Sequence, residues 1–145
     1  MQTFMPYSRF IDVAECLDYR RLGKQRVETK QILMTLLGQS SGWANHPVVR
    51  AWKGYEEGLC VYGLYMCSEW RIRGYEDNLY SEFQQLRLDL RGGSTHMTEF
   101  PPWVYDPVVQ KAYRELLCYK EPEHYEEEFD MVALAVNSFP WERMF

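Results

Sequence analysis

Apolar side chains recur at every third or fourth position along most of this chain, and this period matches the α-helix. The pattern is clearest over residues 47–74, at Trp52, Tyr55, Leu59, Tyr62, Met66 and Trp70. No segment alternates apolar and polar residues for long enough to build a sheet. We therefore predict a mainly α fold: a single compact domain of about five helices over residues 1–145, with a Gly- and Pro-containing loop at 91–105 and an irregular aromatic tail.

Caps, glycines and prolines set the expected helix bounds. The predicted helices span residues 8–18, 18–37, 47–74, 77–90 and 106–119. Ser8 is the expected cap of the first helix, and Asn45-His46-Pro47 has the composition of a helix start. Gly54, Gly58 and Gly63 within the third helix indicate either the close approach of another helix or a bend.

The composition is that of a globular protein. Of the 145 residues, 46% are apolar and 26% are charged, which excludes a disordered or collagen-like chain. No apolar run is long enough to span a bilayer, and acidic residues interrupt the first twenty positions where a signal peptide is apolar. The four cysteines lack metal-ligand spacing, so we expect buried free thiols, no metal, no cofactor and a cytoplasmic protein that does not associate with membranes.

Charge is distributed unevenly along the chain. The net charge of −5 argues against a protein devoted to neutralising phosphates. Residues 1–75, however, hold ten Lys and Arg against seven Asp and Glu, whereas residues 76–145 hold six against fourteen. The basic residues are densest between Arg20 and Lys30, so any nucleic-acid contact is expected there. The aromatic content of 16% is compatible with stacking on bases.

The helix predicted over residues 18–37 is amphipathic. At about 100° per residue, Arg20, Arg21, Lys24 and Glu28 share one polar stripe. Lys24 and Glu28 are also spaced to form an ordinary surface ion pair. Arg26 instead lies on the apolar side, where a guanidinium needs a partner. Two interpretations stay open for Arg26: a buried ion pair that joins helices, or a phosphate-binding arginine.

Several motifs together resemble a known family. They are QTFMPY at 2–7, LDYRRLGKQRVE at 17–28, NHPVV at 45–49, GYEE at 54–57 with Tyr62-Gly63, PPW at 101–103 and PEHY at 122–125. In this order they resemble bacterial and phage proteins grouped with the pyrimidine-dimer DNA glycosylases of the endonuclease V type, and in particular their short branch. The resemblance covers nearly the whole chain.

The resemblance implies a mostly helical glycosylase that also nicks abasic DNA. In that family the N-terminal α-amine attacks the sugar C1′ and forms a Schiff base, a glutamate assists, and arginines on the same helix hold phosphates. An α-amine suits this role because its reference pKa of about 7.7–8.0 leaves far more neutral nucleophile at pH 7 than a lysine has. Gln2 is bulky, so Met1 is expected to be retained and to supply the amine.

The resemblance also assigns the remaining candidate residues. Arg21 occupies the position of the family's glutamate, and Glu28 is the substitute carboxylate on the same stripe. The expected catalytic residues are therefore Met1, Arg21 and Glu28, and the expected DNA-contacting residues are Arg20, Lys24, Gln25, Arg26, Asn45 and His46. His46 also fits a simple helix cap. Gln110 and Tyr113 replace two histidines that are frequent in relatives.

The expected partner is duplex DNA that carries a damaged or modified base. The alternative is a descendant without catalytic activity that binds nucleic acid, a nucleotide or another protein.

Overall fold

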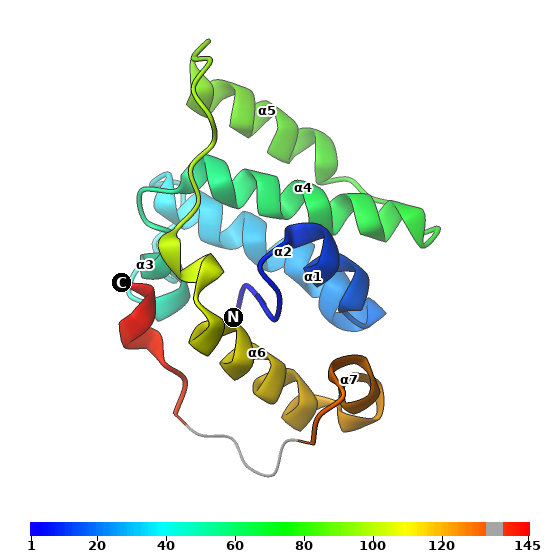
Figure 1. Cartoon of the computed structure of the whole chain (residues 1–145). Coiled ribbons are helices and arrows are strands. Elements are labelled where there is room, and N and C mark those ends of the chain that lie inside the picture. Colours follow the sequence, from blue (N-terminus) through cyan, green and yellow to red (C-terminus); the bar gives the residue numbers. More distant parts are fainter. Residues whose placement is uncertain (133–137) are drawn as a thin grey trace. The chain divides into compact units, whose positions relative to one another are not determined.

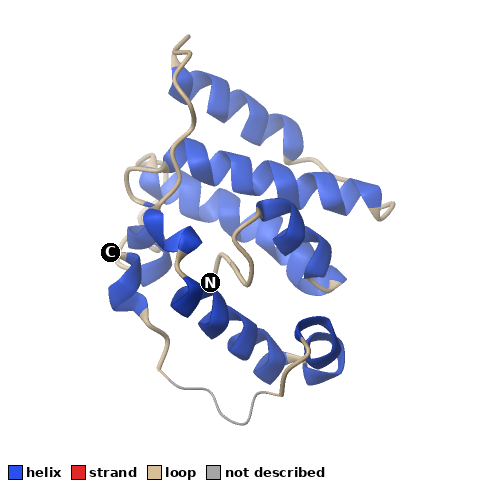
Figure 2. Ribbon diagram, in the orientation of Figure 1, coloured by secondary structure: helices blue, strands red, loops and turns tan. Residues whose placement is uncertain are grey.

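All regular secondary structure in residues 1–132 and 138–145, the part of the chain that the computed structural model describes, is helical (Figure 2). These residues form seven α-helices and two short 3-10 helices: α1 (Phe10–Cys16), α2 (Tyr19–Leu36), α3 (Pro47–Trp52), α4 (Glu56–Ile72), α5 (Tyr80–Arg91), η1 (Pro102–Tyr105), α6 (Pro107–Lys120), α7 (Pro122–Phe129) and η2 (Trp141–Met144). The mainly α prediction is confirmed, with seven α-helices in these ranges instead of about five.

The elements group into two compact units. The first unit comprises residues 1–3 and 19–101, and the second comprises residues 4–18 and 102–145. The expectation of a single domain stays a prediction. Each unit is described separately below.

Helix α4 is the centre of the first unit. It packs against α2 and also against α5, and the shorter α3 packs against α2 (Figure 1). The side chains in these contacts are fully buried on the apolar faces of the helices: Leu22, Ile32 and Leu33 from α2, Leu59, Tyr62 and Met66 from α4, and Phe83 from α5. The apolar face predicted for residues 18–37 is therefore the one that faces the core.

The single helix predicted over residues 47–74 is wrong, because the chain forms two helices there. Helix α3 ends at Trp52, and α4 begins at Glu56. Gly54 between them has φ of 88°, a conformation that other residues rarely adopt, and it ends the first helix. Gly58 and Gly63 instead allow neighbouring segments to lie close to the backbone of α4. A Cβ on them would lie 2.7 Å from the Glu99 carbonyl oxygen and from the Phe83 ring, respectively.

The remaining helix boundaries depend on capping. Ser8 is not the cap of α1, which begins after Arg9 without a side-chain cap. Helix α5 begins at Tyr80, later than predicted, because the Asp77 carboxylate accepts hydrogen bonds from the backbone amides of residues 79 and 80. Asp106 caps α6 as the sequence indicated, accepting from the Val108 amide at 2.9 Å.

In the second unit, residues 4–18 are held against α6 and α7. Phe4 meets Tyr113 of α6 edge to face at 6.0 Å, and Arg114 donates to the Pro6 carbonyl at 2.6 Å. The buried Tyr125 of α7 accepts from the Asp18 amide at 3.0 Å and donates to the Asp18 carboxylate. Within residues 121–130, Tyr125 is thus the fully buried side chain, and the other residues are partly or fully exposed.

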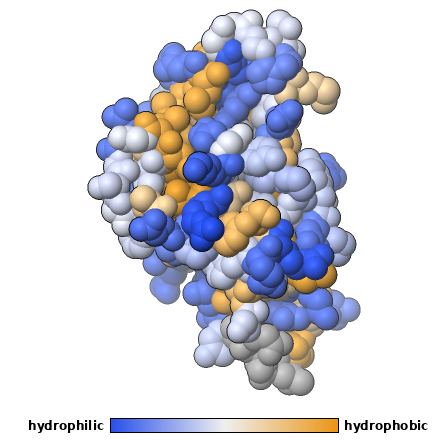
Figure 3. Space-filling model, turned by 90° about the vertical axis from the view of Figure 1, so that its left-hand side faces the viewer, coloured by the Kyte–Doolittle hydropathy of each residue, from blue (hydrophilic) through white to orange (hydrophobic). Residues whose placement is uncertain are grey.

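Large apolar side chains also remain on the surface. On the face drawn in Figure 3, apolar residues form patches among hydrophilic ones. In the ranges with described structure, no helix is long and apolar enough to cross a membrane. Cys16, Cys60, Cys67 and Cys118 are all buried, as predicted, and none of them forms a disulfide.

Candidate active site

The N-terminal residues are fixed in the first unit by hydrogen bonds to α2 and α3. The Trp52 indole donates to the Thr3 hydroxyl at 2.8 Å, and both side chains are fully buried. The Gln25 side-chain amide donates to the Gln2 carbonyl at 2.8 Å. Because buried polar groups are costly to leave unpaired, these contacts hold the start of the chain in one position.

Glu28 lies beside this segment. Its Oε2 accepts a hydrogen bond from the Gln2 backbone amide at 3.2 Å and a second from Gln25 Nε2 at 3.3 Å. The Glu28 carboxylate is therefore held one residue away from the Met1 amine. The side chain is half-buried, so it is less exposed than its place on the polar stripe indicated.

A buried tyrosine fixes the orientation of the Gln25 side chain. The Tyr62 hydroxyl donates to Gln25 Oε1 at 2.6 Å, and both residues have no exposed surface. With its oxygen occupied in this way, the Gln25 amide turns its nitrogen toward Gln2 and Glu28. Gln25 was predicted to contact DNA, but its burial prevents this, and it positions the N-terminal segment instead.

His46 lies near the same groups. Its Nδ1 accepts from the Val48 amide at 3.1 Å, so it caps α3 as the simpler interpretation expected. Burial lowers the pKa of His46, the positive Met1 amine lowers it further, and the Glu28 carboxylate opposes both. The amine, the imidazole and the carboxylate are thus close enough to interact electrostatically. The half-exposed Trp43 meets the His46 ring edge to face at 5.9 Å.

The basic side chains of α2 flank this cluster. Arg20 and Lys24 are exposed, Arg21 is partly exposed, and Asn45 is exposed in the loop before α3. At 100° per residue, Lys24 lies about 40° from Glu28 around the helix and one turn before it. A ligand at the N-terminal amine would thus lie next to a positively charged helix face.

Arg26 does not belong to this face. Its Nε donates to Asp77 Oδ1 at 2.7 Å, its Nη2 lies 2.5 Å from the same oxygen, and its side chain is only 9% exposed. The guanidinium also lies over the Trp70 ring, at 4.9 Å from the ring centroid. Of the two interpretations of Arg26, the structure favours the buried ion pair, and the prediction that Arg26 contacts phosphate is corrected because Asp77 occupies its donors.

A comparison with protein families adds to this geometry. The family model described as pyrimidine dimer DNA glycosylase matches residues 1–82, more than half of the chain. The chain belongs to this family. The matched segment contains the whole cluster of Met1, Glu28 and His46, together with α2, α3 and α4. No curated protein and no solved structure matches the chain.

Gln110 and Tyr113 lie on α6 of the second unit. The Gln110 amide donates to the Val104 carbonyl at 3.0 Å, and Tyr113 is fully buried between Phe4 and Phe139. Both side chains stabilise the packing of that unit.

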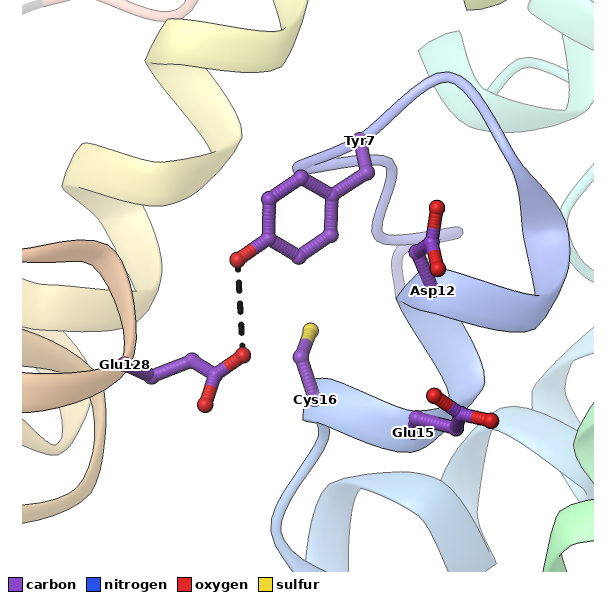
Figure 4. A pocket seen from close by; sticks show the side chains of 5 residues that line it. All are labelled: Tyr7, Asp12, Glu15, Cys16 and Glu128. Carbon is purple, nitrogen blue, oxygen red and sulfur yellow. Dashed lines mark hydrogen bonds between the residues drawn. The ribbon is translucent and has the colours of Figure 1, made fainter.

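The second unit has a hollow of its own, which is acidic. Asp12, Glu15 and Cys16 of α1 line it together with Tyr7 and Glu128, and the Tyr7 hydroxyl points at the Glu128 carboxylate (Figure 4). Burial, with Glu128 nearby, raises the pKa of Tyr7 to about 12. Three carboxylates repel phosphate, so this hollow does not suit DNA. In the described ranges, no three His, Cys, Asp or Glu residues are grouped so as to hold a metal.

The sequence did not identify the residues that hold the N-terminal segment and Gln25 in place. Trp52 contacts Thr3, and Tyr62 contacts Gln25, through hydrogen bonds between residues far apart in the sequence. Asp77 likewise pairs with Arg26 across 51 positions. Trp43 could have been noticed as an aromatic residue two positions before the NHP motif at 45–47.

Proposed function

We propose that this protein is a DNA glycosylase that removes a damaged or modified base and cleaves the resulting abasic site, with the Met1 amine as nucleophile. One observation carries the proposal: the Glu28 carboxylate accepts a hydrogen bond from the backbone amide of Gln2, next to that amine. A carboxylate held beside a primary amine can accept the proton that the amine loses when it attacks. Family membership supports the same chemistry.

The covalent steps balance without a cofactor. The neutral amine attacks C1′, the new N–C1′ bond forms, and the bond from C1′ to the base breaks so that the base leaves with a proton. Loss of the amine's second proton, as a proton returns to the ring oxygen, opens the sugar and gives a Schiff base. Removal of a C2′ proton then expels the 3′-phosphate and cuts the strand.

Glu28 is the proposed acid and base in these steps. Its Oε2 accepts hydrogen bonds from Gln2 and Gln25, so the carboxylate keeps a fixed direction. General acid–base groups of this kind contribute roughly 10²- to 10⁴-fold to rates. Arg21, which replaces the family's glutamate, is proposed to stabilise negative charge near the reacting sugar.

Arg20 and Lys24 are proposed to hold the phosphates on either side of the lesion, with Asn45 and His46 at the far edge of the site. Arg20 and Lys24 lie on the exposed stripe of α2, where long side chains reach solvent. Each phosphate neutralised releases about one counterion, which contributes a slope of about −0.9 to the logarithm of the binding constant against the logarithm of salt concentration.

Borohydride trapping on DNA with a single abasic site tests the proposal. Reduction of the Schiff base gives a stable adduct, which mass spectrometry should map to the Met1 amine. Protein with an acetylated N-terminus is the control and should give none. An adduct at Lys24 would keep the lyase activity and reject the N-terminal nucleophile.

Absence of any adduct would favour the alternative, a descendant without catalytic activity that binds nucleic acid, a nucleotide or another protein. Arg21 in place of the glutamate is the feature that favours this alternative. If the protein then binds abasic DNA without forming an adduct, it is the nucleic-acid-binding version of this alternative.

A further inference from the structure

A stack of aromatic rings lies beside the basic stripe of α2. Trp70, near the end of α4, stacks on Tyr75 with centroids 4.2 Å apart and planes inclined by 24°. Tyr75 in turn faces Tyr19, the first residue of α2, at 6.4 Å and 25°. We call Tyr19, Trp70 and Tyr75 the aromatic stack.

The stack is rigid at its base and open at its end. The Trp70 indole donates to the Glu76 carbonyl at 2.9 Å, and its carbonyl accepts from the Tyr75 amide at 3.2 Å, which fixes the turn that carries Tyr75. Trp70 also lies against Gly23 of α2, where a Cβ would be 3.0 Å from the ring. Tyr19 is nevertheless 50% exposed and Tyr75 is 42% exposed. Two large aromatic side chains are thus held in nearly parallel planes while partly open to solvent.

Cations lie against the stack. Arg20 places its guanidinium 5.6 Å from the Tyr19 ring centroid and donates to the Tyr19 hydroxyl at 3.1 Å. At the other end, Arg26 lies over Trp70. Asp77 is already paired with Arg26, and Glu76 follows Tyr75 in the chain. Arg20 therefore puts a positive charge at the Tyr19 end of the stack.

The stack is also within reach of the candidate active site. Nine steps of 1.5 Å separate Tyr19 from Glu28, or about 14 Å along the axis of α2. Around the helix, Arg20 lies about 100° from Tyr19 and about 80° from Glu28. The basic stripe therefore lies between the aromatic stack and the Met1 amine.

We propose that the aromatic stack binds an unpaired nucleobase of a DNA strand whose phosphates lie along Arg20 and Lys24. The proposal rests on the proposed function only in taking DNA as the ligand. Partly exposed aromatic faces beside cations are the features that bind single-stranded nucleic acid, because every base has a face that stacks and every phosphate is negative. The protein then engages DNA that is locally unpaired beside the lesion, in addition to the lesion itself.

Binding measurements with three fluorescent DNAs test this inference: a single strand, a duplex with one bulged base, and a fully paired duplex without a lesion. Tyr19→Ala should weaken binding to the single strand and to the bulged duplex by roughly 5- to 150-fold, the range expected for one stacked base. Binding to the paired duplex should change by less than about twofold. Tyr19→Phe should keep the wild-type affinities because the ring remains.

Two controls separate stacking from charge and from general damage. Tyr65→Ala removes a similarly exposed tyrosine, 41% exposed on α4, and should leave all three affinities unchanged. Lys24→Ala should weaken binding to all three DNAs and lower the magnitude of the salt slope by about one, whereas Tyr19→Ala should leave that slope unchanged. A strand with 5-iodouracil should crosslink to Tyr19 or Tyr75.

Equal weakening of all three DNAs by Tyr19→Ala, no weakening, or crosslinks only to other residues would each overturn the inference. Its failure is distinguishable from failure of the proposed function, because borohydride trapping at Met1 is measured on the same variants. If the protein binds unpaired bases at Tyr19 but forms no adduct with abasic DNA, the aromatic stack is a binding site and the proposed glycosylase activity is rejected.

Discussion

Arg26 donates through its Nε to Oδ1 of Asp77 at 2.7 Å, and this contact joins the apolar side of α2 to the segment that precedes α5. The Asp77 side chain is fully buried and accepts backbone hydrogen bonds from Leu79 and Tyr80 as well. Burial favours the neutral acid, but the amide of Tyr80 and the Arg26 guanidinium outweigh it and hold the pKa of Asp77 below its ordinary value. One carboxylate thus caps a helix and neutralises a buried arginine.

Arg26→Ala should lower the free energy of unfolding by about 3–5 kcal/mol, because it leaves the Asp77 charge buried without its partner. Urea denaturation measures the loss. The double variant Arg26→Met with Asp77→Asn keeps the volume and an acceptor for the cap without burying a charge, so it should be more stable than Arg26→Ala. Equal stability of the two variants would mean that the ion pair is not what stabilises this contact.

Gly63→Ala should destabilise the packing of α4 on α5 by about 1–3 kcal/mol, since the new Cβ would lie 2.7 Å from the Phe83 ring. Adding Phe83→Leu, which removes the ring, should recover part of this loss. Gly42→Ala is the matched control, because a Cβ there meets no atom within 4 Å. Thermal unfolding of the four proteins checks the prediction, and a Gly63→Ala protein as stable as the wild type would contradict it.

The sequence alone predicted those features of the fold that depend on residues close together in the chain. The period of the apolar residues located α2 to within one residue at each end, and Asp106-Pro107 located the start of α6. Ser8 and the start of α5 were misplaced because capping depends on which acceptor the tertiary structure brings near: Asp77 supplies it to α5, and no side chain supplies it to α1.

The same distinction between local and tertiary contacts applies to the candidate site. Helical geometry puts Arg20, Lys24 and Glu28 on one stripe, since their spacing is local. Helical geometry does not predict that the first residues of the chain lie beside Glu28, nor that Gln25 and Tyr62 fix their position. Those contacts join residues that are 23 to 37 positions apart. The partner of Arg26 could be anticipated as a carboxylate but not as Asp77.

Glu28→Gln should lower turnover by about 100-fold or more with little change in the affinity for DNA, which is the pattern for loss of a general acid–base group. The fold should persist because glutamine keeps an oxygen that can accept from Gln2. Single-turnover kinetics and a melting curve measure the two effects. Glu82→Gln, which removes a surface partner of Lys30, is the control and should retain full activity. Full activity of Glu28→Gln would exclude this carboxylate from the chemistry.

The stability of the first unit should fall with acid partly through Glu57. Burial alone would raise the pKa of this carboxyl, but hydrogen bonds from Thr98 and Arg91 hold it below its ordinary value. A depressed pKa in the folded state means that the stabilisation is complete above about pH 4.3 and is lost as the pH falls through the folded pKa. Glu57→Gln should therefore flatten the decline of unfolding free energy below about pH 5, measured by urea titrations at several pH values. An unchanged slope would contradict the prediction.

The position of the Met1 amine can be tested without DNA through the pKa of His46. Burial and the positive amine lower this pKa, and the Glu28 carboxylate raises it. Acetylating the N-terminus removes the positive charge, so the pKa of His46 should rise, whereas Glu28→Gln removes the negative charge, so it should fall. Titration of the imidazole resonances by NMR measures both changes. Shifts of opposite sign would support an N-terminal amine, an imidazole and a carboxylate that share one site, and the absence of any shift on acetylation would place the amine outside the site that contains His46.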